Sequence, residues 1–100
     1  MRNQPTETVC QEADRIVSND RQNEYGTPRH DFTRTGRIWG ALLSEWARTT
    51  KGEGPVPPEL VGLCMVGVKM SREINKHRRD NIVDGIGYLK TVDMVMDGKV

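Results

Sequence analysis

A short apolar segment that follows two prolines constrains the fold of this chain more than any other feature. Residues 60–68 read LVGLCMVGV, and Pro57, Pro58 and Glu59 precede them. Proline in the first turn of a helix sacrifices no hydrogen bond, so these residues predict a helix start. The segment is apolar on nearly every face, which is typical of a helix surrounded by others. We therefore predict that a helix over residues 58–76 is the central, most buried element.

Three further segments have apolar residues at helical spacing. The first, residues 6–18, begins at a possible cap, Thr6, and has one apolar stripe: Val9, Ala13, Ile16 and Val17. The second begins at Thr27 and Pro28 and runs to about residue 49, with Phe32 and both tryptophans on the inward face. The last, residues 80–96, directs six apolar residues inward: Ile82, Val83, Ile86, Leu89, Val92 and Val95. No segment alternates with period two, so we expect a single all-α domain, a compact bundle of about four helices.

The composition limits the compartment and the classes of partner. A chain of 100 residues has a modest core of its own, which favours assembly as a homo-oligomer. Its 15 Lys and Arg against 14 Asp and Glu leave a net charge of +1, so neither nucleic acid nor an acidic membrane is indicated. Cys10 and Cys64 lack the spacing of a zinc site or a redox pair, and no apolar run is long enough for a membrane span. We expect a reduced, cytoplasmic protein.

Residues 69–88, KMSREINKHRRDNIVDGIGY, contain the candidate site. Lys69, Arg72 and Glu73 are three and four apart and should share one helix face, and Asp80 and Asp84 repeat this spacing on the next helix. If the two helices pack antiparallel, the carboxylates can hold Mg²⁺ and the cations can neutralise a phosphate. The same residues also fit ordinary roles, because aspartates cap helices and complement their dipoles, and Lys and Glu four apart form surface ion pairs.

Residues 21–28, RQNEYGTP, have the composition of a loop. They also include side chains that can bind a ligand, which a passive linker does not need. Tyr25 beside a glycine can stack on a base or sugar while Arg21 reaches a phosphate. The alternative is a tyrosine ring that closes the end of the bundle.

The order of these motifs resembles a known family. R-x-x-x-Y-G-x-P-x-x-x-F from Arg21, then Trp39, then K-x-x-R-E from Lys69 and D-N-x-x-D-x-x-G-Y from Asp80 are similar to a family of small phage and prophage proteins. That family resembles, more distantly, the all-α MazG-like nucleoside triphosphate pyrophosphohydrolases. The similarity spans about residues 12–92.

The MazG-like resemblance implies a four-helix module, assembled as a dimer or tetramer, in which carboxylate-bound Mg²⁺ positions a nucleoside triphosphate for attack by water. Those enzymes carry E-E-x-x-E and E-x-x-D, whereas this chain has Glu73 alone and then D-x-x-x-D. A nucleotide-binding groove without the full catalytic set is therefore as credible as a pyrophosphohydrolase. The candidate ligand-binding residues are Arg21, Tyr25, Lys69, Arg72, Asn81 and Tyr88, and the candidate metal ligands are Glu73, Asp80 and Asp84.

Three functions remain open at this point. The first is a nucleotide-binding protein of MazG-like character, a Mg²⁺-dependent pyrophosphohydrolase if it is an enzyme. The second is a non-catalytic counter-defence protein that sequesters a signalling nucleotide in a bacterial host. The third is a small adaptor whose exposed apolar face binds and redirects a host protein.

Overall fold

Helices make up nearly all of the structure, a computed structural model that describes residues 6–98 apart from the side chains of residues 19–22. The elements in chain order are α1 (Val9–Arg15), a π-helical turn η1 (Ile16–Asp20), α2 (Arg21–Tyr25), α3 (Pro28–Thr50), α4 (Pro58–Asn75) and α5 (Arg79–Met96). No strand occurs within the described range, which confirms the all-α prediction. The described residues form five α-helices, where about four were expected.

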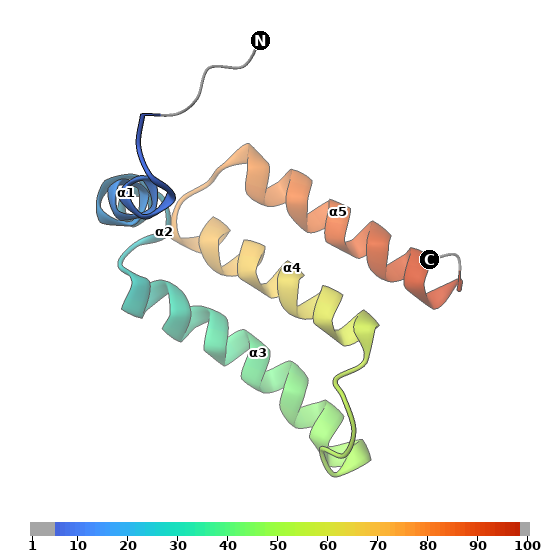
Figure 1. The fold of residues 1–100 in the computed structure, drawn as a ribbon. Helices are drawn as coiled ribbons and strands as arrows, with labels where there is room; N and C mark the ends of the chain where they lie inside the picture. Colours follow the sequence, from blue (N-terminus) through green and yellow to red (C-terminus); the bar gives the residue numbers. More distant parts are fainter. Residues whose placement is uncertain (1–5, 99–100) are drawn as a thin grey trace.

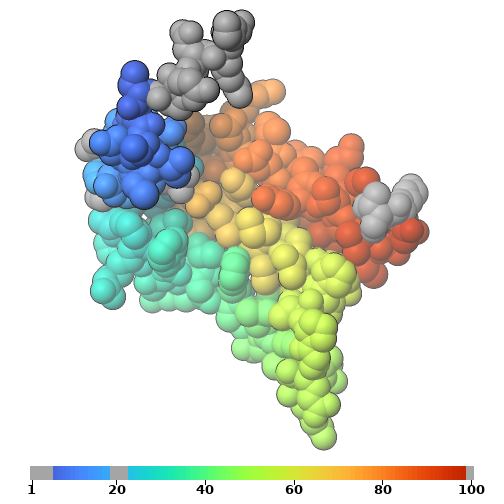
Figure 2. All heavy atoms as spheres, viewed as in Figure 1, coloured from blue at the N-terminus to red at the C-terminus, as the bar shows by residue number. Residues whose placement is uncertain are grey.

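The helix predicted to be central is central. Figure 1 shows α3, α4 and α5 side by side, with α4 in the middle and the α1–α2 segment across one end of the layer. The buried residues of α4 are Cys64, Gly67 and Ser71. The Trp39 indole Nε1 of α3 donates a hydrogen bond of 2.7 Å to the Cys64 carbonyl, which ties α3 to α4. Figure 2 shows the connection between α3 and α4 projecting away from the rest of the molecule.

The helix starts follow local sequence, with two corrections. Thr27 caps α3 by accepting a 3.3 Å hydrogen bond from the His30 amide, and α4 begins at Pro58, both as predicted. The cap of α1 is Thr8 instead of Thr6, because Thr8 forms a reciprocal capping box with Gln11. The N-cap position of α5 is Arg78, which places Asp80 in the first turn of the helix.

The prediction of a loop over residues 21–28 is wrong for its first half. The π-helical turn η1 continues the helix from the end of α1, and residues 21–25 form α2. The helix ends at Gly26, whose φ of +82° is easily reached only by glycine. Asn75 of α4 donates a 3.0 Å hydrogen bond to the Glu24 carbonyl, so packing against α4 holds this short helix.

Much of the apolar surface predicted to turn inward is exposed. Four predicted core residues of α5 are 46% to 55% exposed: Ile82, Val83, Ile86 and Leu89. Phe32 is 70% exposed and Val9 is 84% exposed. Among the described hydrophobic residues only Cys64 is buried. The reason is geometric, because three helices in one layer cover each other only along their edges.

Candidate functional site

Side chains from α2, α3 and α4 meet at the end of the layer where α2 lies. The Arg72 guanidinium lies over the Tyr25 ring, 4.1 Å from its centroid, so two of the predicted ligand-binding residues are in contact. The Asp31 carboxylate is buried beside them. Its Oδ2 is 3.9 Å from Arg72 Nε, and its Oδ1 is 3.9 Å from Arg34 Nη2. The cluster therefore holds one carboxylate between two guanidinium groups.

Arg34 fixes the geometry of this cluster. Its Nε donates a hydrogen bond of 3.2 Å to the Ser71 carbonyl, and its Nη2 donates one of 3.0 Å to the Tyr25 carbonyl. The Ser71 hydroxyl in turn donates a 3.4 Å hydrogen bond to the Asp31 carbonyl. One arginine of α3 thus positions the tyrosine of α2 and the turn of α4 that carries Arg72.

Two polar atoms of the cluster are left without hydrogen-bond partners. Asp31 Oδ1 and Arg72 Nε are both buried and make no hydrogen bond. The separations of 3.9 Å within the cluster are too long for direct hydrogen bonds. A buried polar group without a partner costs about 1–3 kcal/mol, and more when it is charged.

A cavity of about 280 Å³ lies beside this cluster, between α3 and α4. Asp31 and Arg72 form its polar side. The remaining lining comes from aromatic, small and aliphatic residues: Phe32, Thr35, Gly36, Trp39 and Val68. An aromatic-lined hollow with two charged residues on one side has the properties of a ligand site.

Asp31 and Arg34 were not predicted from the sequence. Asp31 follows Pro28 in the first turn of α3, where an acidic residue complements the helix dipole, and Arg34 is its i+3 neighbour. Both residues therefore look like ordinary surface residues of a helix. Their environment depends on Tyr25, Ser71 and Arg72 of other helices, and no local pattern reports those contacts.

The predicted common face of Lys69, Arg72 and Glu73 is divided between two sides of α4. Lys69 points to α5, where its Nζ is 3.1 Å from Asp84 Oδ2. Lys69 and Glu73 border an apolar hollow of about 300 Å³ between α4 and α5. Arg72 faces α2 and α3 instead. The prediction of one shared groove is wrong for Arg72, because the two flanking helices attract neighbouring polar side chains in different directions.

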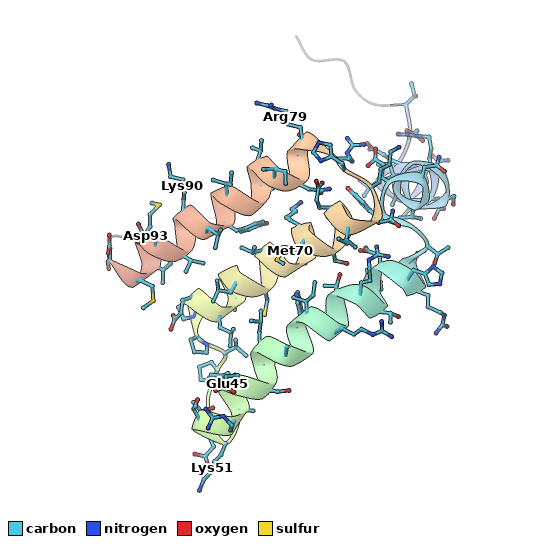
Figure 3. All side chains as sticks on the ribbon, turned by 180° about the vertical axis from the view of Figure 1, so that it is seen from behind. Glu45, Lys51, Met70, Arg79, Lys90 and Asp93 are labelled. Carbon is cyan, nitrogen blue, oxygen red and sulfur yellow. The ribbon has the colours of Figure 1, made fainter. Side chains whose placement is uncertain are left out.

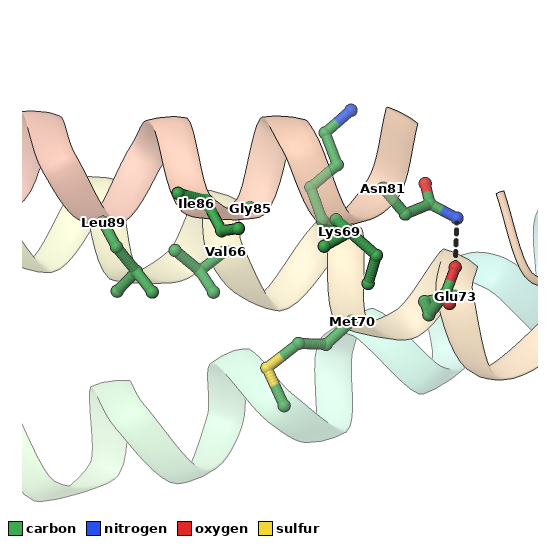
Figure 4. A pocket seen from close by; sticks show the side chains of 9 residues that line it. Val66, Lys69, Met70, Glu73, Asn81, Gly85, Ile86 and Leu89 are labelled. Carbon is green, nitrogen blue, oxygen red and sulfur yellow. Dashed lines mark hydrogen bonds between the residues drawn. The ribbon is translucent and has the colours of Figure 1, made fainter. Parts of the chain in front are cut away.

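Glu73 is engaged at the turn between α4 and α5. Its Oε1 accepts hydrogen bonds from the Arg78 amide at 2.9 Å and from Asn81 Nδ2 at 3.1 Å, the second of which is drawn in Figure 4. Its Oε2 contacts the His77 ring nitrogen Nδ1. The His77 hydrogen bond, followed by that of the Arg78 amide, lowers the pKa of Glu73 to about 2.

The three predicted metal ligands do not form one group. Glu73 is turned to the α4–α5 connection, Asp84 pairs with Lys69, and Asp80 is exposed in the first turn of α5. Among the side chains that the structure describes, no three His, Cys, Asp or Glu are placed together to hold a metal ion. Bound Mg²⁺ stays a prediction.

The remaining predicted residues lie elsewhere. Tyr88 and Asp84 border a shallow hollow of about 500 Å³ along α5, apart from the Tyr25 cluster. Asn81 is buried by its contact with Glu73. The side chain of Arg21 lies outside the described residues. Residues 76–79 form a short basic segment, KHRR. Its Arg78 forms an ion pair with Glu24 and thereby links the start of α5 to α2.

Replacing Glu73 by glutamine should reduce the acid sensitivity of the fold. The pKa of Glu73 falls from an ordinary value of 4.5 to about 2 on folding, so its contribution to stability is fully present above pH 4.5. That contribution is lost as the pH falls from 4.5 to about 2. Urea unfolding at several pH values should show a shallower decline for Glu73→Gln than for the native chain. Glu53→Gln, in the exposed α3–α4 connection, controls for the loss of one charge; equal slopes for all three proteins would contradict this assignment.

Comparison with known proteins identifies the family. The family described as Domain of unknown function (DUF6378) matches residues 8–95, from the cap of α1 to the last turn of α5. The chain therefore belongs to this family. No curated protein and no solved structure matches the chain. Among the described helices, none is long and apolar enough to cross a membrane.

Proposed function

We propose that this member of DUF6378 is a nucleotide-binding protein, and that the nucleotide binds at the cavity between α3 and α4. One observation carries the proposal: Arg72, which lies over the Tyr25 ring, lines an aromatic-lined cavity together with Asp31. A ligand with hydrogen-bond acceptors for the guanidinium and a ring that stacks on the aromatic side chains fits this lining. Nucleotides provide such groups on a flat, stackable ring.

Arg72 and Tyr25 suit this role. The Tyr25 ring covers one face of the planar guanidinium and keeps it oriented. A guanidinium presents several donors in a fixed fork and binds phosphate or carbonyl oxygens in pairs. Arg72 remains close to the protein surface, because its side chain is 20% exposed. A nucleotide at the cavity therefore meets Arg72 as it enters.

The acidic residues between α4 and α5 already have partners in the chain, which favours nucleotide binding without hydrolysis. A metal-dependent hydrolase needs carboxylates that are free to hold the ion and a water that the ion activates. Here Glu73 accepts hydrogen bonds from Arg78 and Asn81, and Asp84 pairs with Lys69. We therefore place a nucleotide-sequestering protein, such as a phage counter-defence protein, ahead of a MazG-like, Mg²⁺-dependent pyrophosphohydrolase.

Thermal-shift measurements with nucleotides, with and without Mg²⁺, test the proposal. A ligand of the folded state raises the melting temperature by mass action. We expect Arg72→Ala to abolish the shift, because it removes the donors at the cavity, and Asp84→Asn to retain it without a need for Mg²⁺. The melting temperature of each variant without ligand reports whether it is folded.

The reverse pattern would favour the metal enzyme. In that case the shift would depend on Mg²⁺ and on Asp84, and a triphosphate incubated with the protein would release pyrophosphate. If no nucleotide shifts the melting temperature, nucleotide binding is wrong, and capture of a stoichiometric host protein from lysate would then support the adaptor function.

We also propose that the chain works as a homo-oligomer. Its accessible surface of 7806 Å² exceeds the roughly 5,700 Å² of a compact monomer of its mass. Its radius of gyration of 16.7 Å exceeds the roughly 13 Å of a compact domain of this length. The uncovered surface is rich in apolar side chains along α4 and α5, including Met70, Ile82, Ile86 and Leu89. A second copy of the chain that covers this face completes the core that the single chain lacks.

A further inference from the structure

We propose that α1 of one copy of the chain docks in a hollow at the start of α5 of a second copy. This inference rests on the homo-oligomer proposed above and specifies a contact that joins the two copies. Both surfaces are exposed in the single chain. They are complementary, because α1 has an apolar stripe with acidic neighbours and the hollow on α5 has apolar walls with basic neighbours.

The apolar stripe of α1 is uncovered in the single chain. The backbone of α1 approaches that of η1, and within the described residues it packs against none of α3, α4 and α5. Val9 is 84% exposed and Val17 is 44% exposed. The stripe borders a hollow of about 270 Å³ whose lining comes from α1 and η1 alone: Val9, Glu12, Ala13, Ile16 and Val17. Short helices in proteins are stabilised mainly by packing of their apolar face, so this stripe is suited to a partner.

The second surface is a hollow of about 340 Å³ at the start of α5. Its lining combines three aliphatic side chains with an imidazole and a guanidinium: Ile82, Val83, Ile86, His77 and Arg79. All of these residues are exposed in the single chain. Ile82 and Ile86 also line the hollow between α4 and α5. The docking surface for α1 is therefore continuous with the apolar face that a second copy is proposed to cover.

The charges of the two surfaces are opposite. Residues 6–18 contain three acidic residues and one basic residue, whereas residues 76–79 contain two arginines and one lysine. Glu12 lies among the apolar residues of the stripe, and Arg79 lines the hollow on α5. Among the ion pairs of the described residues, none involves either of these two side chains. Asp80, the carboxylate beside Arg79 in sequence, does not line the hollow. Glu12 is therefore expected to pair with Arg79 of the partner subunit.

Both surfaces lie at the same end of the helical layer. Glu24 of α2 pairs with Arg78 at the start of α5, and its carbonyl accepts a hydrogen bond from Asn75 of α4. These contacts hold α2, from which η1 and α1 continue across the end of the layer (Figure 1). A two-fold axis near this end lets each chain give its α1 to the other and receive one in return. The exchange adds to the α4–α5 contact, since a helix of seven residues by itself falls short of the roughly 800 Å² that each partner of a standard interface buries.

Sedimentation equilibrium of the full chain and of two charge-reversed variants, Glu12→Lys and Arg79→Glu, tests the contact. Each variant alone places like charges at both contacts of the dimer, so its dissociation constant should rise roughly 10-fold. An equimolar mixture of the two variants should recover the native affinity, because each contact of the mixed dimer again joins opposite charges. A contact within one chain could not be restored by mixing.

Two further variants control for the change of charge. Glu53→Lys and Lys90→Glu make the same changes of net charge at exposed positions outside both surfaces. They should leave the dissociation constant unchanged, separately and mixed. Glu12, Arg79 and the two control residues are all exposed, so the single chain should keep its fold in each variant, which circular dichroism verifies.

Val9→Ser tests the apolar half of the contact. The side chain of Val9 has little to lose in the single chain, where it is 84% exposed, and its truncation should weaken only the association. Val56→Ser is the matched control, because Val56 is also exposed but lies in the connection between α3 and α4. It should leave the dissociation constant unchanged.

The outcomes separate this inference from the proposals on which it rests. A native homo-oligomer that none of Glu12→Lys, Arg79→Glu and Val9→Ser weakens overturns the α1 contact and leaves the homo-oligomer in place. Weakening by both charge reversals without recovery on mixing also overturns it. A native chain that stays monomeric overturns the α1 contact and the homo-oligomer together. Nucleotide binding is decided separately, by the thermal-shift measurements.

Discussion

Replacing Ile86 by aspartate is expected to dissociate the homo-oligomer and to lower the melting temperature. Ile86 is 55% exposed in the single chain and lies in the hollow between α4 and α5, beside Val66 and Leu89 (Figure 4). If a second copy covers this face, the aspartate would be buried without a partner, at a cost of several kcal/mol. Sedimentation equilibrium or light scattering should then give a multiple of 11.3 kDa for the native chain and a smaller mass for the variant.

Lys90→Ala is the matched control for Ile86→Asp, because both substitutions change the net charge by one negative unit. Lys90 is exposed on α5 and points away from α4 in Figure 3. The Lys90→Ala substitution should leave the assembly and the melting temperature nearly unchanged. A native chain that sediments as a stable monomer of 11.3 kDa would contradict the homo-oligomer, whatever the variants do.

Replacing Gly67 by alanine is expected to destabilise the protein by about 1–3 kcal/mol, as overpacking of a core typically does. A Cβ at Gly67 would lie 2.9 Å from Ile38 Cγ2 and 3.4 Å from Trp39 Cδ1. Isoleucine is branched at Cβ and stiff in a helix, so Ile38 cannot easily move its methyl group aside. The backbones of α3 and α4 must then separate, and Gly67→Ala should unfold at a lower urea concentration than the native chain.

The control is Gly40→Ala in α3, where an added Cβ has nothing within 4 Å. Alanine has a better helix propensity than glycine, so this substitution should stabilise the protein by about 0.5–1 kcal/mol. The two glycine substitutions should thus have opposite signs. If both stabilise the protein to the same extent, the close packing of α3 on α4 at Gly67 is wrong.

The parts of the fold that depend on neighbours in sequence were predictable. The proline pair before an all-round apolar segment located the start of α4 and its place between two other helices. Thr27 and Pro28 located the start of α3 in the same way. Caps and first-turn prolines act on the backbone within a few residues, so a local pattern contains all the information that these predictions need.

The predictions that failed depended on contacts between distant residues. Helical periodicity places Ile82 and Ile86 on one face of α5, but it does not state how far another helix covers that face, and in the single chain α4 covers it only in part. Residues 21–28 have the composition of a loop, and packing against α4 makes their first half a helix. Lys69 and Arg72 are neighbours on one helix surface, yet they pair with different helices.

The candidate site was recognised in part. Tyr25 and Arg72 were chosen separately, from a loop and from a helix, and the structure places one over the other. Asp31, the buried carboxylate of the cluster, carries no distinguishing signal in its own helix. Its importance arises from burial and from an unsatisfied oxygen, and both properties exist only after α4 has packed against α3.

The amino-acid sequence by itself determined that the chain is helical, where α3 and α4 begin, and which helix is central. Each of these follows from backbone hydrogen bonding and apolar periodicity within one segment. Only the tertiary structure decided which polar groups are buried without partners and which apolar faces remain uncovered. Burial depends on every helix that surrounds a side chain, and Asp31 and Arg72 acquire their environment from α2, α3 and α4 together.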